Sequence, residues 1–342
     1  MDLKERIVTH AKELGFCKIG FTTADDLPRV YEQTVERDYP ETFLKMAETG
    51  ARPREIAPDA KSIIVLAFDF SDIDYPKEML ERVGMVYLSQ SFLPLDGSPA
   101  RERLNAFEEF LESEGVPFVD GRPIMIRPAA MRAGVASFGK NNFSYVDGVG
   151  SFVTLYAYLT PVEFEPDEPT PECECPPNCH LCIDACPTNA MGEPFNLDCN
   201  KCIVWVNALS WSRGDVRDVP LDLRTDLGEH IHGCDVCQMV CPRNRPALKQ
   251  SKKPDAVLER IAPQFSLENL LHMPDGFYED CVFPIMYNYV RDPVVFQRNA
   301  AIAMGNSGDP KYIPDLEEEL NNPNEVIRSH VQWALDQLKA TV

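Results

Sequence analysis

The first 160 residues alternate between helical and strand-like spacing of their apolar side chains. Residues 3–14 place apolar positions three and four apart, and Gly15 is a typical C-terminal stop, so this segment predicts a helix. Residues 101–114 repeat the helical period with charges on the opposite side. Short apolar runs bounded by turn residues predict strands, at residues 17–21, 61–70 and 151–160. The pattern predicts a mixed α/β domain over residues 1–160.

The C-terminal end has helical spacing and an internal echo. Residues 292–304 begin with Asp-Pro, and residues 322–334 begin with Asn-Pro and carry an arginine in the same register. Helical units that start with proline and repeat at this distance are typical of HEAT repeats, whose helix pairs supply interaction surfaces. We expect a HEAT-like helical domain over residues 256–342.

A proline-rich acidic segment follows the α/β domain. Residues 161–174 contain six acidic residues, four prolines and no basic residue. This composition is typical of a solvated linker, and the prolines give the carboxylates no common face for a metal ion.

The charge balance limits the partners. The chain has 342 residues, 33 of them basic and 54 acidic, and its net charge of −21 argues against general affinity for nucleic-acid backbones or anionic membranes. The length accommodates two or three domains. No apolar run reaches the length of a membrane span, and the N-terminus shows no secretory pattern. We expect a cytoplasmic protein that does not contact membranes.

Ten of the twelve cysteines lie between Cys173 and Cys241. They end in two copies of one motif, Cys179-x2-Cys182-x3-Cys186-Pro187 and Cys234-x2-Cys237-x3-Cys241-Pro242. In bacterial two-cluster ferredoxins this ending supplies ligands to one iron–sulfur cube and sends its last cysteine to the other. We expect two [4Fe–4S] clusters in a ferredoxin-like domain over residues 161–255.

Each motif needs a leading cysteine. Pro176 occupies the simple x2 position before the first motif, so Cys175 is the nearest candidate and Cys173 the second. Before the second motif, Cys202 is the candidate and Cys199 its rival. The predicted ligands are Cys175, Cys179, Cys182 and Cys241 for one cluster, and Cys186, Cys202, Cys234 and Cys237 for the other.

Zinc and disulfides are the alternatives for these cysteines. Cys-x2-Cys pairs also build zinc ribbons. Zinc, however, explains neither the doubled Cys-Pro ending nor eight suitably placed cysteines. A disulfide framework belongs to secreted proteins.

Two other segments each allow two interpretations. Residues 243–253 contain five basic residues and no acid, which predicts either a landing site for a polyanion or a solvated loop beside negative clusters. Gly134-x4-Gly139-Lys140 has Walker A spacing, but Asn141 replaces the Ser or Thr that binds Mg²⁺. Because no buried strand precedes it, we favour simple turns there.

Several short strings occur together in the order of one known family. They are Leu14-Gly15-Phe16, Arg52-Pro53-Arg54-Glu55, Pro58-Asp59-Ala60-Lys61-Ser62-Ile63, Asp120 with Pro123 and Arg127, Ala133-Gly134 with Phe138-Gly139-Lys140-Asn141, Gly150-Ser151-Phe152, Leu159-Thr160, Cys186-Pro187-Thr188-Asn189-Ala190 and Gly233-Cys234-Asp235-Val236-Cys237-Gln238-Met239-Val240-Cys241-Pro242. Through these strings, which span residues 1–250, the chain resembles the epoxyqueuosine reductase family. Members are iron–sulfur and cobalamin-dependent enzymes related to reductive dehalogenases.

The resemblance implies a corrinoid between the α/β domain and the cluster domain. It also implies an external donor of the ferredoxin or flavodoxin type. The family's catalytic aspartate falls on Asp120, and Arg127, Lys140 and Asn141 fall in the cofactor pocket. A carboxylic acid there can protonate the oxygen that leaves carbon. From the residues alone, Asp120-Gly121 is also a common turn pair.

The departures from the family concern the substrate. Where the family has a Gly-Arg-Asp-Tyr-His-like string, this chain has Ser89-Gln90-Ser91-Phe92-Leu93-Pro94-Leu95. Together with the charge of −21, this argues against tRNA and for a small-molecule or modified-nucleoside substrate. We expect an α+β, oxygen-sensitive reductase for two-electron reductive cleavage. The rivals are a true tRNA epoxyqueuosine reductase and an electron-transfer protein that reduces a partner's corrinoid.

Overall fold

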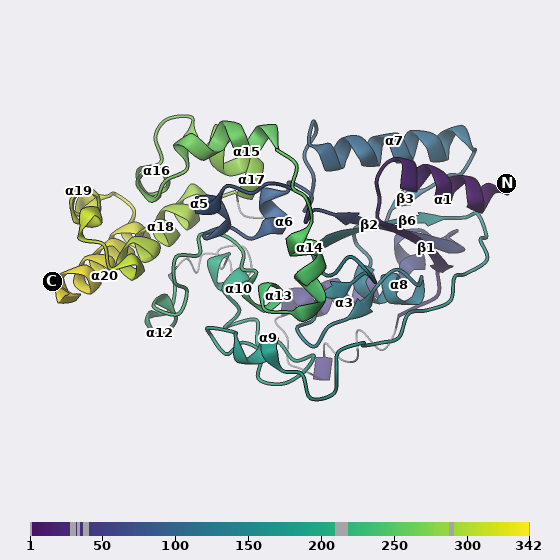
Figure 1. The fold of residues 1–342 in the computed structure, drawn as a ribbon, viewed down its shortest axis with the longest axis horizontal. Coiled ribbons are helices and arrows are strands. Elements are labelled where there is room, and N and C mark those ends of the chain that lie inside the picture. The colour runs from purple at the N-terminus through teal and green to yellow at the C-terminus, as the bar shows by residue number, and fades with distance from the viewer. Residues whose placement is uncertain are drawn as a thin grey trace.

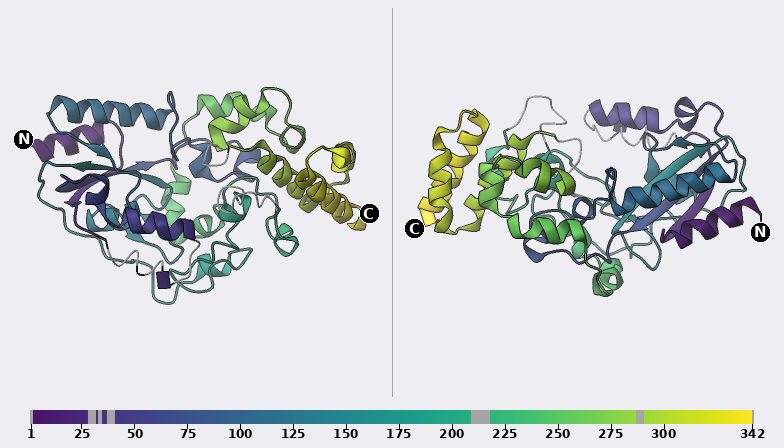
Figure 2. Two further views of the ribbon diagram at one scale, coloured as in Figure 1. Left: turned by 180° about the vertical axis from the view of Figure 1, so that it is seen from behind. Right: turned by 90° about the horizontal axis from the view of Figure 1, so that it is seen from above.

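The structure is a computed structural model that describes residues 2–27, 32, 35–36, 41–208, 218–286 and 291–341. Figure 1 shows an α/β unit at the N-terminal end, a cysteine-rich region of short helices beneath the middle, and a helical unit at the C-terminal end. The two termini lie at opposite ends of an elongated molecule (Figures 1 and 2). None of the described helices combines the length and the apolar character that a membrane span requires.

The N-terminal unit is built on a four-stranded antiparallel sheet. Its order is β1-β2-β6-β3, with the strands at Lys18–Thr23, Ser62–Asp69, Val153–Thr160 and Val119–Asp120. The three predicted strands are therefore confirmed. The short edge strand β3 places Asp120 directly opposite Tyr158 of β6.

Both faces of the sheet are covered. In β2, Ile64, Leu66 and Phe68 face one apolar cluster, and the alternate residues face another. Helices α1 (Leu3–Glu13) and α7 (Pro99–Ser113) pack on the first face, and α8 (Ile126–Arg132) packs on the second (Figure 1). The two predicted helices are thus confirmed, and Gly15 ends α1 with a φ of +86°.

Short elements complete the α/β unit and the cysteine-rich region. In the first they are α3 (Glu41–Gly50), α4 (Pro53–Ile56), α5 (Lys77–Leu80), α6 (Met85–Leu88), β4 (Ser137–Phe138) and β5 (Ser144–Tyr145). In the second they are α9 (Leu181–Asp184), α10 (Ile203–Asn207), α12 (Leu221–Arg224), α13 (Val236–Met239), η1 (Pro242–Asn244) and α14 (Arg245–Lys249).

The C-terminal unit is helical throughout its described elements. They are α15 (Ala256–Ile261), η2 (Ala262–Gln264), α16 (Leu267–His272), η3 (Tyr278–Val282), α17 (Phe283–Met286), α18 (Pro293–Ser307), η4 (Pro310–Tyr312), α19 (Ile313–Glu318), η5 (Glu319–Asn321) and α20 (Glu325–Thr341). Most of each echoed segment lies in α18 or α20, and these two helices pack against each other. Gly305 permits this close approach, because a Cβ there would lie 2.8 Å from the Cα of Ala334. Their grouping as HEAT repeats stays a prediction.

Packing crosses the predicted domain boundaries, which stay predictions. Met79, Val83 and Leu88, from the N-terminal half, are buried in one apolar cluster with Phe296 and the other core residues of the C-terminal helices. The predicted linker is irregular and largely exposed, but it is tied down. Asp167 accepts hydrogen bonds from the Phe21 N–H at 2.8 Å and from Lys4 Nζ at 2.7 Å.

Candidate functional site

The two cysteine motifs adopt the same local structure. Cys182 lies in the single turn of α9 and Cys237 in that of α13, and the two turns contact each other. No disulfide joins any of the twelve cysteines, all of which lie in the described part of the chain. The disulfide alternative therefore has no support in this fold.

Three cysteines of the first predicted ligand set lie close together: Cys175, Cys182 and Cys241. Burial raises the pKa of Cys182, and the neighbouring Cys175 and Cys241 raise it further. Cys173 also lies close, since its Sγ accepts a hydrogen bond from the Cys175 N–H at 3.3 Å. The loop that carries these residues is largely exposed. We call the predicted first ligand set the outer set: Cys175, Cys179, Cys182 and Cys241.

The other four cysteines form an inner set. Burial raises the pKa of Cys234 to about 12, and Cys202 and Cys186 are among the neighbours that raise it further. Burial also raises the pKa of Cys237, next to Cys234 and Cys202. The rival Cys199 lies in an apolar cluster and is only 5% exposed. We call the predicted second ligand set the inner set: Cys186, Cys202, Cys234 and Cys237.

The two sets fit iron–sulfur clusters as a donor type. Burial raises the pKa values of Cys182, Cys202, Cys234 and Cys237, and a bound metal centre would supply the positive charge that stabilises their thiolates. Within the described residues, no three His, Cys, Asp or Glu side chains converge closely enough to hold a single metal ion. The ligands of a cube bind separate iron corners, so they lie further apart. The individual ligand roles stay predictions.

The β4–β5 hairpin holds both cysteine motifs. Asn141 Nδ2 donates to the main-chain carbonyl of Cys237 at 3.2 Å and to Tyr145 Oη at 3.0 Å. Lys140 Nζ donates to three main-chain carbonyls of the outer loop at 2.9, 2.7 and 2.9 Å, those of Pro176, Pro177 and Cys179. Of the three predicted cofactor-pocket residues, Lys140 and Asn141 therefore bind the cysteine loops. The Walker A interpretation has no support, because carbonyl oxygens surround the lysine.

A buried polar network, not found from the sequence, joins the second motif to the start of β6. Asn244 accepts from the Ser151 N–H and donates to Ser151 Oγ, both at 2.8 Å. Ser151 Oγ also donates to Gln238 Oε1 at 2.9 Å. Gly150 has a φ of +104°, and a Cβ there would lie 2.5 Å from Asn244 Oδ1. The Gly-Ser pair was the only signal in the sequence.

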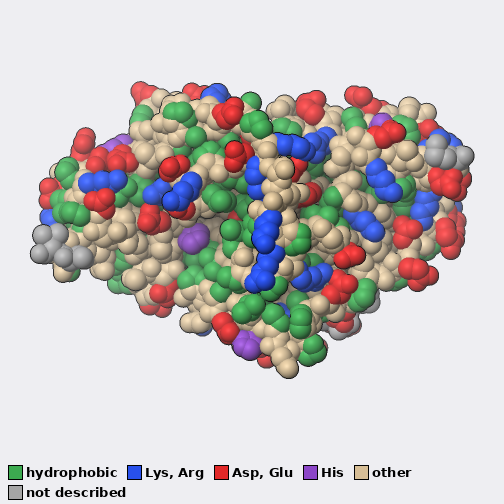
Figure 3. Space-filling view, viewed as in Figure 1, with side chains coloured by type: hydrophobic (Ala, Val, Ile, Leu, Met, Phe, Trp, Pro, Cys, Tyr) green, Lys and Arg blue, Asp and Glu red, His purple; other side chains and the backbone are tan. Residues whose placement is uncertain are grey.

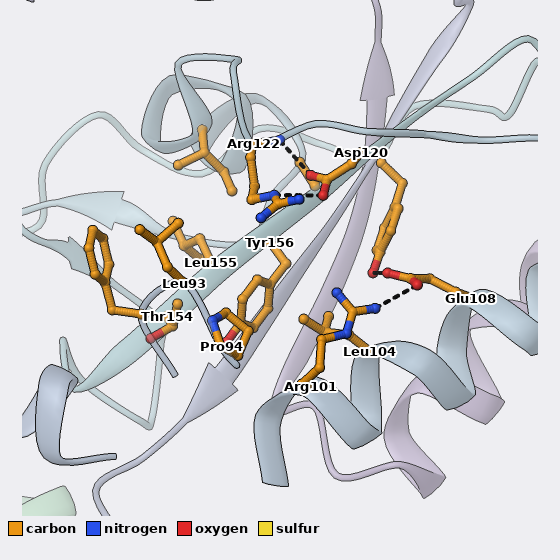
Figure 4. Close-up of a pocket in the computed structure, with 14 residues that line it drawn as sticks. Leu93, Pro94, Arg101, Leu104, Glu108, Asp120, Arg122, Thr154, Leu155 and Tyr156 are labelled. Carbon is orange, nitrogen blue, oxygen red and sulfur yellow. Dashed lines mark hydrogen bonds and ion pairs between the residues drawn. The ribbon is translucent and has the colours of Figure 1, made fainter. Parts of the chain in front are cut away.

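A pocket lies between β6, α7 and residues 92–94 (Figure 4). Its volume is about 120 Å³. Most of its lining is apolar, and Asp120 is at its edge. The complete lining is Phe92, Leu93, Pro94, Arg101, Leu104, Glu108, Asp120, Arg122, Ile126, Thr154, Leu155, Tyr156, Ala157 and Tyr158. Residues 92–94 belong to the string that departs from the family.

Asp120 combines the two sequence interpretations. Its side chain is 41% exposed and lines the pocket. It also begins a turn, because its Oδ1 accepts from the Arg122 N–H at 2.8 Å. Arg122 Nε donates to Asp120 Oδ2 at 2.6 Å (Figure 4). Arg127 does not line the pocket; its Nη1 donates to the Asn142 carbonyl at 2.5 Å.

A second ionic group lies on the other side of the pocket. Glu108 accepts from Arg101 Nη2 at 2.6 Å and from Tyr158 Oη at 2.8 Å (Figure 4). Burial and the adjacent Glu108 both raise the pKa of Tyr158. The phenol is therefore held protonated as a hydrogen-bond donor. The sequence showed these residues only as a helix face and a strand.

Helix α6 connects the inner set to the pocket. The Gly84 N–H donates to the His232 carbonyl at 2.9 Å, next to Cys234. The Tyr87 ring lies 4.2 Å from the His232 ring and 5.6 Å from the Phe92 ring. Phe92 lines the pocket. The Tyr87 ring therefore lies between His232, two residues before Cys234, and Phe92 of the pocket lining.

Comparisons with known proteins agree with this architecture. A family described as a 4Fe-4S double cluster binding domain matches residues 174–244. The chain is similar to the epoxyqueuosine reductase of Bacillus subtilis, with 30% identity over 98% of this chain and 88% of the relative. The corresponding enzyme of Listeria monocytogenes is 31% identical over 97% of this chain and 88% of the relative.

Solved structures give the same result. A Bacillus subtilis epoxyqueuosine reductase, with its catalytic aspartate loop swung out of the active site, matches with a TM-score of 0.79 at 28% identity, over 98% of this chain and 90% of that one. An epoxyqueuosine reductase with an epoxyqueuosine-modified tRNA-Tyr stem loop matches with a TM-score of 0.77, at the same identity and coverage. The match to relatives over nearly the whole length, together with the double-cluster domain, shows that the chain is an iron–sulfur oxidoreductase of the epoxyqueuosine reductase family.

Proposed function

We propose that electrons enter at the outer cysteine set, pass to the inner set and reach a substrate in the Asp120 pocket. The supporting observation is the continuous contact from the second motif through α6 to the pocket lining. When bound, the [4Fe–4S] clusters would supply electrons one at a time. The proposed ligands are the outer and inner sets, with Cys173 and Cys199 as spares. We place this chemistry in the cytoplasm, where metal-binding thiols stay reduced.

The proposed reaction is reductive deoxygenation. Removing the oxygen of an epoxide takes two electrons and two protons, leaves a carbon–carbon double bond and releases water. Asp120 would give a proton to the leaving oxygen. Tyr158 donates its single O–H to Glu108, so it would shape the pocket wall without donating to the substrate. To act, Asp120 must exchange its bond to Arg122 for one to the substrate.

Cobalamin is the proposed electron carrier to substrate on the family resemblance alone. The described pocket, at about 120 Å³, is well below the roughly 300–1,000 Å³ that encloses a drug-sized ligand. The pocket beside Asp120 is therefore too small by itself to enclose a corrinoid. The test is to add cob(II)alamin to anaerobically prepared protein. We expect the protein to retain it with a shifted absorption spectrum; no retention would exclude cobalamin from the proposed function.

The proposed substrate is a modified nucleoside or a similar small molecule. The pocket holds a small group between apolar side chains, and Phe92, Leu93 and Pro94 narrow it. tRNA is the second candidate, and the specific observation in its favour is the full-length match to a relative solved with a modified tRNA stem loop. Anaerobic assays with epoxyqueuosine as free nucleoside and in a tRNA stem loop, analysed by mass spectrometry, separate the two.

The catalytic role of Asp120 is tested by Asp120→Asn. We expect turnover to fall about 10²- to 10⁴-fold, the usual contribution of a general acid. Iron content should stay at the wild-type level. Asp147→Asn, at an exposed position outside the pocket, is the matched control. Undiminished turnover in Asp120→Asn would remove the residue from the mechanism. A protein that reduces the corrinoid of a partner protein but no small substrate would favour the electron-transfer alternative.

A further inference from the structure

Three exposed apolar side chains lie directly over the cysteine turns. Leu181 on α9 is 47% exposed, Met239 on α13 is 42% exposed, and Val240 is 38% exposed. Leu181 precedes Cys182, and the other two stand between Cys237 and Cys241. Since α9 and α13 contact each other, these three exposed side chains lie on or directly after two neighbouring turns beside the outer set.

Two exposed cations follow the second motif along the chain. Arg245 and Lys249 lie one turn apart on α14, four and eight residues after Cys241. In Figure 3 a column of Lys and Arg side chains crosses the middle of the molecule among hydrophobic side chains. We call Leu181, Met239, Val240, Arg245 and Lys249 the donor face.

Other basic residues of this segment are engaged with the protein itself. Arg243 pairs with Glu174 at 2.6 Å, and Lys253 pairs with Asp72 at 2.6 Å. Lys252 Nζ donates to main-chain carbonyls at 2.5 and 3.2 Å. Among the described contacts, the side chains of Arg245 and Lys249 have neither a hydrogen bond nor an ion pair. In a chain of net charge −21, these two side chains are exposed positive charges close in sequence to the second motif.

We propose that the donor face is the docking surface for a small acidic electron-carrier protein. An apolar centre with a charged border is the usual anatomy of a protein interface, and electron-transfer interfaces are small. Single-stranded nucleic acid would require aromatic stacking platforms, and the donor face has no aromatic residue. Carrier docking here would bring its redox group next to the outer set. This inference rests on the proposed function, because it assumes that clusters occupy the two sets.

The test measures reduction of the clusters by reduced flavodoxin, an acidic flavin carrier, in anaerobic stopped flow. Arg245→Glu with Lys249→Glu should lower the second-order rate constant at least tenfold at low salt, and the difference should shrink as salt rises. Met239→Asp, which keeps both cations, should also slow the reaction. Lys12→Glu with Lys18→Glu, at exposed positions on the α/β unit, is the control with the same charge change.

Reduction by dithionite separates this proposal from the proposed function. All variants should react with dithionite at the wild-type rate and hold wild-type iron. If iron is absent from the wild type, the proposed function fails. If iron is present but the donor-face and control variants react equally with flavodoxin, the docking proposal is overturned. A loss of affinity for a tRNA stem loop, with the flavodoxin rate unchanged, would overturn it in favour of a nucleic-acid surface.

Discussion

Replacing Lys140 by methionine should loosen one cysteine loop and leave the other in place. The substitution keeps the length of the side chain and removes the ammonium group. Three main-chain carbonyls of the outer loop then lose their common donor. The inner set is held by other contacts, among them the bond from Asn141 to the Cys237 carbonyl. Only the outer set should therefore release iron faster.

The size of this effect follows from the hydrogen bonds. A bond to a charged group contributes about 1.5–3 kcal/mol. Pro176 and Pro177 are exposed, so water can replace the ammonium at these two carbonyls. We therefore expect the substitution to cost the free energy of about one such hydrogen bond, about 1.5–3 kcal/mol. If opening of the loop limits iron loss, a barrier lowered by this amount makes iron loss about 10- to 150-fold faster.

The assay follows iron transfer to a chelator under anaerobic conditions. Lys140→Met should give two phases of equal amplitude, a fast one for the outer set and a slow one at the wild-type rate. Lys61→Met is the matched control, because Lys61 is exposed and lies 3.9 Å from its partner Glu163. Equal acceleration of all the iron, or no acceleration, would refute the assignment of Lys140 to the outer loop.

Two further predictions concern single side chains. Arg122→Gln should change stability by less than about 1 kcal/mol, because the pair with Asp120 is exposed, and should raise turnover by up to about fivefold; a loss of turnover would show that the arginine itself acts. Burial alone would lower the pKa of His272, but its hydrogen bonds and ion pairs with Glu319 and Asp315 outweigh burial and raise it. The stability that protonated His272 gains from Glu319 and Asp315 is therefore fully present below about pH 6.5 and is lost as the pH rises through the raised pKa of the folded state. Hydrogen exchange in α19 should therefore become faster above that pKa, and His272→Gln should abolish this pH dependence.

Elements whose signal is local could be predicted from the sequence. Strand β2 is buried on both faces, so its apolar run needed no information from elsewhere. Helices α1 and α7 carry their own period and caps. The division of eight cysteines into two sets also followed from spacing, because consecutive ligands fix short loops. In the structure Cys237 lies near Cys234 and Cys202 and also near Cys182 of the other set, so the division stays a prediction.

Contacts between distant segments could not be predicted. Lys140 and Asn141 were placed by resemblance in a cofactor pocket, whereas the β4–β5 hairpin turns them onto carbonyls far along the chain. The sequence placed Arg101 and Glu108 on one predicted helix. The hydrogen bond from Tyr158 to Glu108, however, depends on how this helix packs against the sheet. Helix α6 had no signal of its own.

The shared core of residues 79–88 and the C-terminal helices limits how the chain can be divided. A protein shortened before α15 would expose the buried side chains of Met79, Val83 and Leu88. Each exposure costs about 1.5–3 kcal/mol. The same segment carries α6, which contacts the second cysteine motif. The C-terminal helices therefore cannot be removed without cost: a shortened protein would need new core packing to hold α6 between the second cysteine motif and the pocket.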